Sequence, residues 1–230
     1  NGFKNIELSG GTEYYNGLED DLLELKEKYN LNYTCHNYFP PPIEHFVLNL
    51  ASLNNEIFEK TSNHLVKALE LSKKLGAKKF GFHAGFLIDI KLSEIGKRIS
   101  KDNIFDKDKA IQRFCYGFKE LQSLAGDVKL YVENNVFSFT NYETYNGYNI
   151  FLLISSDEYY ELKNKIDFNL LLDVAHLKVS SKTLGLDFED ELKKMIAISD
   201  YVHISDNDAL HDLNHKLQKD STLVELLSQQ

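Results

Sequence analysis

The sequence has little of the residue types and runs that mark several protein classes. It has two cysteines, Cys35 and Cys115, which lie far apart and fit neither a disulfide framework nor a cysteine-rich zinc motif. A reducing compartment is therefore expected, and we predict a cytoplasmic protein. No apolar run approaches the length of a transmembrane helix, and no signal peptide is recognised.

Motifs that bind phosphate groups are also missing. The sequence contains neither a GxGxxG fingerprint nor a Walker A motif. Its formal net charge of −9 at pH 7 gives no general electrostatic attraction for nucleic acid, although a local basic groove is compatible with it. We therefore expect no membrane partner and no nucleic-acid partner, and a homo-oligomer stays open.

The length and the apolar content suit one α/β domain. Single α/β barrels commonly reach this length, and a hydrophobic content of 43% is ample for a core. No repeat or low-complexity linker marks a boundary, so we predict one domain over residues 1–230. The first residue is Asn1 rather than Met, which leads us to expect a fragment or a processed product.

Strand-like and helix-like segments alternate along the chain. Short apolar runs bounded by polar residues predict strands at 3–8, 32–36, 78–82, 128–132, 168–172 and 201–204. Helical spacing of apolar residues predicts helices at 17–29, 54–75, 108–124, 157–165, 188–198 and 221–227. Two long loops, 86–107 and 136–148, separate some of them. The alternation predicts a parallel sheet, either doubly wound or closed.

Side chains that bind metals stand at the ends of five successive predicted strands, namely His36, His83, Glu133, Asp173 and His203. Such residues should gather at one switch point of a doubly wound sheet, whereas every strand of a barrel contributes to one rim. We therefore predict an α/β fold of the TIM (β/α)8-barrel type. Buried carboxylates and imidazoles that converge on one rim are best explained by a cation that compensates their charge.

The stretch 169–176 shows the pattern most compactly. Three leucines run into Asp173, and His176 follows three residues later. Asp and His both suit a divalent metal. The plainer interpretation is an Asp that caps a helix, followed by an incidental His.

These segments resemble the xylose isomerase-like TIM-barrel superfamily, which includes sugar and sugar-phosphate isomerases and epimerases and endonuclease IV-type apurinic/apyrimidinic (AP) endonucleases. The matching segments, in the family's order, are Ile6-Glu-Leu-Ser9, His36 with Asn49-Leu-Ala-Ser52, Phe82-His-Ala-Gly85, Val132-Glu-Asn134, Leu172-Asp-Val-Ala-His176 and Val202-His-Ile-Ser-Asp206. Each motif is short. The ordered set is fairly specific for the superfamily and not for one activity.

The resemblance implies roles for the strand-end residues. Glu133, Asp173 and His203 correspond to ligands of a central metal ion, and His176 to a residue that contacts the substrate or a metal. In the epimerase branch, Glu133 is also one of two carboxylates that move a proton at the carbon beside a carbonyl. The metal there polarises the substrate oxygens and stabilises an enediolate.

In the endonuclease branch, His36 and His83 hold a second zinc that shares Glu133. There, His176 and an Asp-x-His pair hold a third zinc. His215 fits the His of that pair, but Leu213 stands where its Asp is expected, and Asp212 is one position away.

The family's fourth central ligand is a Glu on the last strand, and we find no strand after the helix at 221–227 to carry one. The first strand, which should precede Phe3, is not found either. We therefore expect six of the eight strands of a barrel, in a fragment that lacks both ends or in a protein with an incomplete site.

The leading hypothesis is a divalent-metal-dependent isomerase or epimerase that acts on a small sugar or sugar phosphate through an enediolate. The catalytic candidates are Glu133 and His176. The metal-ligand candidates are Glu133, Asp173, His203, His36, His83 and His215. Zn or Mn is favoured, with Mg or Co as alternatives, and no organic cofactor is expected.

Two alternatives stay open, an endonuclease IV-type zinc phosphodiesterase and a non-catalytic sugar-binding barrel. The aromatic loops around Tyr38–Phe39 and Phe137–Tyr148 either form an apolar wall against the carbon face of a sugar or pack over the barrel rim.

Overall fold

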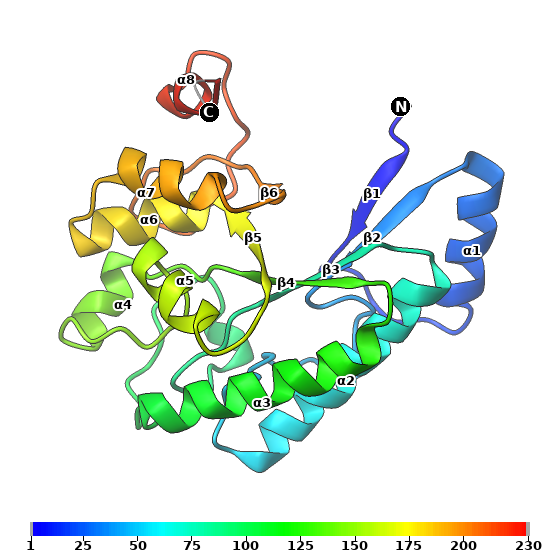
Figure 1. Cartoon of the computed structure of the whole chain (residues 1–230), viewed down its shortest axis with the longest axis horizontal. Coiled ribbons are helices and arrows are strands. Elements are labelled where there is room, and N and C mark those ends of the chain that lie inside the picture. Colours follow the sequence, from blue (N-terminus) through cyan, green and yellow to red (C-terminus); the bar gives the residue numbers. More distant parts are fainter. Residues whose placement is uncertain (1, 229–230) are drawn as a thin grey trace.

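The computed structural model describes residues 2–228, and six parallel strands form its sheet in the order β1-β2-β3-β4-β5-β6. The strands are β1 (Asn5–Leu8), β2 (Asn32–His36), β3 (Lys79–His83), β4 (Lys129–Glu133), β5 (Asn169–Asp173) and β6 (Tyr201–His203). The sheet curls so that its edge strands β1 and β6 face each other across an open side (Figure 1). This half-barrel confirms the predicted barrel-type α/β fold with six strands.

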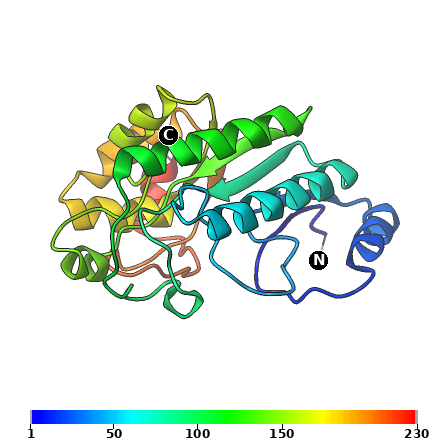
Figure 2. The same ribbon diagram turned by 90° about the horizontal axis from the view of Figure 1, so that it is seen from below.

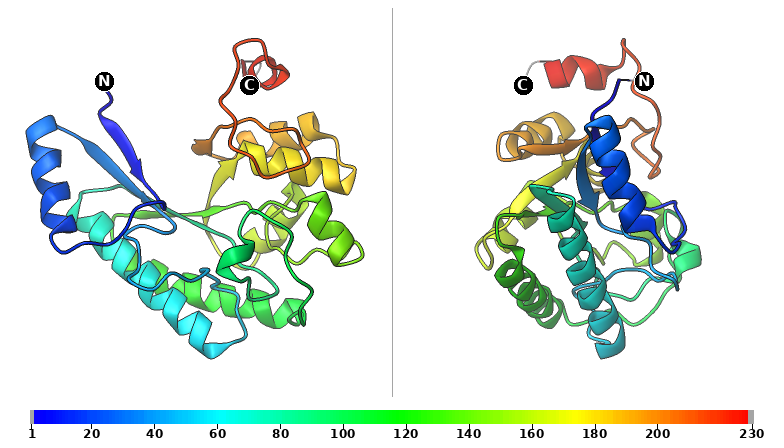
Figure 3. Two further views of the ribbon diagram at one scale, coloured as in Figure 1. Left: turned by 180° about the vertical axis from the view of Figure 1, so that it is seen from behind. Right: turned by 90° about the vertical axis from the view of Figure 1, so that its right-hand side faces the viewer.

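The helices lie between successive strands along the chain, except the last helix, which follows β6. They are α1 (Leu18–Tyr29), α2 (Asn55–Lys74), the 3-10 helix η1 (Leu92–Glu94), α3 (Lys107–Ala125), α4 (Phe139–Thr144), α5 (Ser156–Lys163), α6 (Val174–Leu184), α7 (Phe188–Ile196) and α8 (Thr222–Ser228). Figure 2 shows α2 and α3 side by side. Figure 3 shows α8 apart from the sheet, beyond α7. No helix within residues 2–228 has the length and apolar character needed to cross a membrane.

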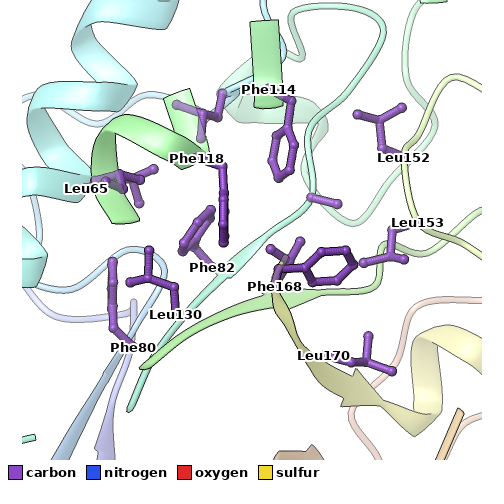
Figure 4. Close-up of a cluster of buried hydrophobic side chains, with 14 of the residues drawn as sticks. Leu65, Phe80, Phe82, Phe114, Phe118, Leu130, Leu152, Leu153, Phe168 and Leu170 are labelled. Atoms are coloured by element: carbon purple, nitrogen blue, oxygen red, sulfur yellow. The ribbon is translucent and has the colours of Figure 1, made fainter. Parts of the chain in front are cut away.

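The main core lies between the sheet and the helices on its convex side. Large aromatic side chains of the strands and of α3, including Phe80, Phe82, Phe114 and Phe118, are fully buried and pack together (Figure 4). Burying such a side chain stabilises the fold by about 1.5–3 kcal/mol. Because this core fills the convex side, the strand ends are left free to carry polar groups.

A second, smaller core joins the two long loops. Its buried residues come from the β3–α3 loop and from the segment after β4, and they are Ile88, Ile99, Phe137, Tyr145, Ile150, Phe151 and Ile154. The loops therefore form one packed wall beside the strand ends.

Polar side chains set the starts of several helices. Asn54, Asp106, Ser155, Asp173 and Asp187 each accept a backbone N–H in the first turn of α2, α3, α5, α6 and α7. These caps satisfy amide groups that have no partner within the helix. The predicted strands and helices agree with the structure to within two residues at their ends.

Two α-helices were not predicted. Helix α6 buries Val174, Ala175, Leu177, Val179, Ser180 and Ser181. A helix buried on several sides shows no amphipathic period, so its spacing gave no signal. Helix α4 is short and lies in the aromatic segment predicted as a loop, where packing in the second core holds it.

Candidate metal centre

The sheet register brings the ends of neighbouring strands side by side. His83 pairs in register with Glu133, and Asp173 pairs with His203. Glu133 is the last residue of β4 and is only 1% exposed. Since parallel strands end at the same rim, the curl of the sheet turns these side chains toward one another.

One group of three ligands consists of Glu133, Asp173 and His203, whose ligand atoms all lie within 4.8 Å of one another. Nδ1 of His203 is 3.2 Å from Oε1 of Glu133 and 4.0 Å from Oδ2 of Asp173. Two carboxylates and an imidazole suit a divalent cation such as Zn or Mn.

Asp173 also caps helix α6. Its Oδ1 accepts the backbone N–H of His176 at 2.8 Å, which leaves Oδ2 on the side of His203. The capping and the metal interpretations of the stretch 169–176 are therefore compatible, because each uses a different oxygen of the same carboxylate.

A second group consists of His36, His83 and Glu133, again within 4.8 Å. Nε2 of His36 is 2.6 Å from Oε2 of Glu133. Nδ1 of His83 lies 3.2 Å from the same oxygen but is buried without a hydrogen bond to any described residue. Buried polar atoms are nearly always satisfied, so this nitrogen fits the role of a metal ligand.

The electrostatics of the cluster centre on Glu133. Burial acts to raise the pKa of this carboxyl group, but the imidazoles of His83 and His36 and the hydrogen bond with His203 hold the pKa well below its usual range. Burial lowers the pKa of His83 to about 4, so its ring is neutral at pH 7. An ionised carboxylate and a neutral imidazole are the forms that bind metal ions.

His203 is protonated while no ion is bound. Burial acts to lower its pKa, but hydrogen bonds to Glu133 and Glu7 raise the pKa to about 10. A cation that binds at Nδ1 must therefore displace a proton, and its affinity must depend on pH.

His176 lies beside this cluster. Its Nδ1 is 2.8 Å from the carbonyl oxygen of Asn134, and its Nε2 is 3.6 Å from Oδ1 of Asp212. Burial acts to lower the pKa of His176, but the carboxylates of Asp173 and Glu133 raise it above the usual value. The contact with Asn134 makes Nδ1 the donor and leaves Nε2 for a ligand.

The structure does not bring His215 to the cluster. This residue is exposed and belongs to neither ligand group of the described residues. A two-way backbone pairing between Asp206 and His215, at 3.0 and 2.8 Å, holds its loop to the segment that follows β6. Asp212, which the sequence places one position from the expected Asp, is the residue that approaches His176.

Sequence reasoning missed Glu7 on β1. Its carboxylate accepts from Nε2 of His203, with 2.9 Å to Oε1, and from the hydroxyl of Tyr201. Burial acts to raise the pKa of Glu7, but these hydrogen bonds and the charge on His203 lower it. The available signal was the alternation along Asn5–Leu8, which places Glu7 on the face opposite Ile6 and Leu8.

A pocket of about 270 Å³ opens next to the cluster. His83 and His176 are among the residues that line it, and Phe46, Phe86 and Phe151 are among its apolar residues. Its exposed lining surface is mostly apolar, and several polar and charged side chains also line it. Such an arrangement is typical of small-molecule sites.

Of the two alternatives for the aromatic loops, the wall against a ligand is formed only in part. Tyr38 lines the pocket, and so do Ser138, Thr140 and Asn141 of the second loop. Phe39 and Phe137 are buried in the two cores and pack over the rim instead.

The comparisons with known proteins agree with this architecture. A D-tagatose 3-epimerase-like protein has a TM-score of 0.71 and 18% identity, and the match covers 99% of this chain and 77% of that one. A D-psicose 3-epimerase, crystallised in the presence of D-fructose, has a TM-score of 0.58 and 14% identity over 89% of this chain; the match spans 63% of that enzyme.

Endonuclease IV from Thermus thermophilus has a TM-score of 0.56 and 16% identity, and the match covers 98% of this chain and 85% of that one. Among curated proteins, no sequence matches this chain. The family model described as a xylose isomerase-like TIM barrel matches residues 1–221. The chain therefore belongs to the xylose isomerase-like TIM-barrel family.

Proposed function

We propose that the protein is a divalent-metal-dependent isomerase or epimerase of a small sugar or sugar phosphate. The observation that carries the proposal is the grouping of Glu133, Asp173 and His203 within 4.8 Å at the strand ends, beside a mostly apolar pocket. The sugar epimerases among the similar structures support this choice.

The described residues fit a divalent ion, with Zn or Mn first and Mg or Co as alternatives. Glu133, Asp173 and His203 would hold it. When bound, the ion supplies a Lewis acid that polarises carbonyl and hydroxyl oxygens of a sugar. The pocket wall formed by Phe46, Phe86 and Phe151 would pack against the carbon face of the ring.

Glu133 is the proposed base. Its low pKa keeps it ionised at neutral pH, and it accepts the proton from the carbon beside the carbonyl. Loss of that proton leaves an enediolate. A proton from solvent then reaches the opposite face and inverts the carbon, while Glu133 releases the proton it took to solvent. For this transfer the substrate carbon must come within hydrogen-bond reach of the carboxylate. His176, with Nε2 on the pocket side, would hold a substrate hydroxyl.

The second candidate is an endonuclease IV-type zinc phosphodiesterase. The group of His36, His83 and Glu133 favours it, because it offers a second metal site. The net charge of −9 and the absence of His215 from both ligand groups of the described residues weigh against it. The third candidate is a sugar-binding barrel without catalysis, supported because no further carboxylate joins Glu133, Asp173 and His203 within residues 2–228.

The test is elemental analysis of the purified protein with Glu133→Gln and Asp173→Asn. Asp187→Asn is a matched control, since Asp187 caps α7 as Asp173 caps α6 but lies outside both ligand groups. We expect one tightly bound divalent ion per chain, lost or weakened in the two site variants and kept in the control. Three zinc ions per chain would support the phosphodiesterase, and no ion at any metal concentration would support the binding barrel.

The reaction itself is tested by NMR. Incubation with ketohexoses and their phosphates in D2O should introduce deuterium at the inverted carbon, because the proton passes through a base that exchanges with solvent. Glu133→Gln should abolish this exchange. Exchange that persists in the variant would show that another group is the base.

A further inference from the structure

We propose that Glu7 is a positioning residue that fixes the ring of His203 for metal binding. The inference rests on the proposed metal site formed by Glu133, Asp173 and His203. It adds a residue on β1, from the opposite edge of the sheet, to a site whose proposed ligands lie on β4, β5 and β6.

The contact joins the second nitrogen of His203 to the Glu7 carboxylate. Nε2 of His203 is 2.9 Å from Oε1 and 3.0 Å from Oε2 of Glu7, so both oxygens are within hydrogen-bond distance. The other nitrogen, Nδ1, points to Glu133 at 3.2 Å and to Asp173 at 4.0 Å. The two nitrogens therefore have separate partners on opposite sides of the ring.

This arrangement determines which nitrogen is available to a cation. A neutral imidazole carries one N–H group, and a carboxylate can only accept, so contact with Glu7 places the hydrogen on Nε2. The lone pair then lies on Nδ1, toward Glu133 and Asp173. A carboxylate on the distal nitrogen of a metal-binding histidine fixes its orientation and makes the ligand more basic.

Glu7 is itself held in place by β6. The hydroxyl of Tyr201 donates to its carboxylate, and the Tyr201 ring packs edge-on against Tyr131 at 5.2 Å between centroids. Figure 1 shows that β1 and β6 are the two edges of the curled sheet. These side-chain bonds thus connect the edges across the open side, which would also give Glu7 a structural role.

The structural contribution of Glu7 should be small. Its side chain is 30% exposed, and ion pairs near the surface typically contribute about 0–1 kcal/mol to stability. A direct ligand role is not favoured either, because Glu7 belongs to neither ligand group of the described residues. The largest effect of the residue should therefore appear in metal affinity.

The experiment measures the zinc dissociation constant of the full chain by competition with a chelator, together with the absorption spectrum of the cobalt-loaded protein. Glu7→Gln and Glu7→Ala should bind zinc about 10–100-fold more weakly than the wild type and should alter the cobalt spectrum. Tyr201→Phe is the matched control, because it removes the other bond to Glu7 and keeps the contact with His203. Its zinc affinity should stay within about threefold of the wild type.

The outcomes separate the two proposals. A wild-type protein that binds no zinc would refute the metal site. Zinc binding that is lost in Asp173→Asn but unchanged in a folded Glu7 variant would overturn only the role of Glu7. If Tyr201→Phe weakens zinc binding as much as the Glu7 variants do, the role of Glu7 is also overturned. A loosened sheet edge would then explain the weaker binding in all three variants. If Glu7→Ala does not fold, the nearly isosteric Glu7→Gln decides.

Discussion

The two carboxylate oxygens of Asp173 make different contacts, and substitutions should distinguish the capping contact from the proposed metal contact. Oδ1 caps helix α6 through the backbone N–H of His176, whereas Oδ2 faces His203. Asparagine keeps an acceptor for the cap but loses the negative charge, and alanine loses both. We expect Asp173→Asn to lose metal binding with little loss of stability, and Asp173→Ala to lose both.

The expected losses of unfolding free energy follow from the helix cap and from the burial of Asp173. Removal of an N-cap acceptor costs about 0.5–2 kcal/mol, and a value near the upper end is expected because Asp173 is only 6% exposed. Asp173→Asn should cost about 0.3–1 kcal/mol, through the lost interaction of the charge with the helix dipole. Asp187→Ala, at the exposed start of α7, should lose only cap stability and keep the metal.

The assay is urea unfolding of the metal-free variants, followed by zinc titration of each. If Asp173→Asn binds zinc as tightly as the wild type, the ligand assignment is wrong. If Asp173→Ala is as stable as Asp173→Asn, the capping bond does not contribute as argued.

Three further predictions concern other residues. Zinc affinity should fall about tenfold per pH unit below pH 10, because Glu133 and Glu7 raise the pKa of His203 to about 10 and the ion must displace the proton that His203 then carries. Zinc affinity that does not change between pH 6 and pH 8 would contradict this. His215→Ala should leave zinc affinity unchanged, because the residue lies outside both ligand groups, and isothermal titration checks this. Burial lowers the pKa of His64 from 6.5 to about 4, so the unfolded chain binds the proton more readily and stability should fall by about 3 kcal/mol as the pH drops from 6.5 to 4. In urea unfolding, His64→Gln should flatten this pH dependence. An unchanged dependence of the unfolding free energy on pH would contradict the role assigned to His64.

The sequence predicted those elements that local patterns determine. Strands such as Asn169–Asp173 are short apolar runs between polar residues, and the helix start at Asn55 follows a capping Asn54. Helix α6 was not predicted, because its residues are buried on several sides and therefore show no amphipathic spacing. Its capping Asp173 and the following Gly185, in a left-handed conformation, were the signals that could have defined it.

The strand-end cluster was predictable because parallel strands of a barrel share one rim. That rule brings Glu133, Asp173 and His203 together without any knowledge of their side-chain contacts. Their roles as ligands stay predictions. Glu7 could not be found this way, because its partner His203 is 196 residues away and the contact crosses the open side of the sheet. The position of His215 depends on loop pairing with Asp206, which spacing along the chain does not encode.

The most direct test of the proposed metal centre is anomalous X-ray diffraction at the zinc absorption edge, from crystals of the protein soaked in zinc. We predict a peak about 2 Å from Nδ1 of His203 and from carboxylate oxygens of both Glu133 and Asp173. Zinc bound elsewhere, with no peak among these three side chains, would contradict the proposed metal centre and the chemistry that depends on it.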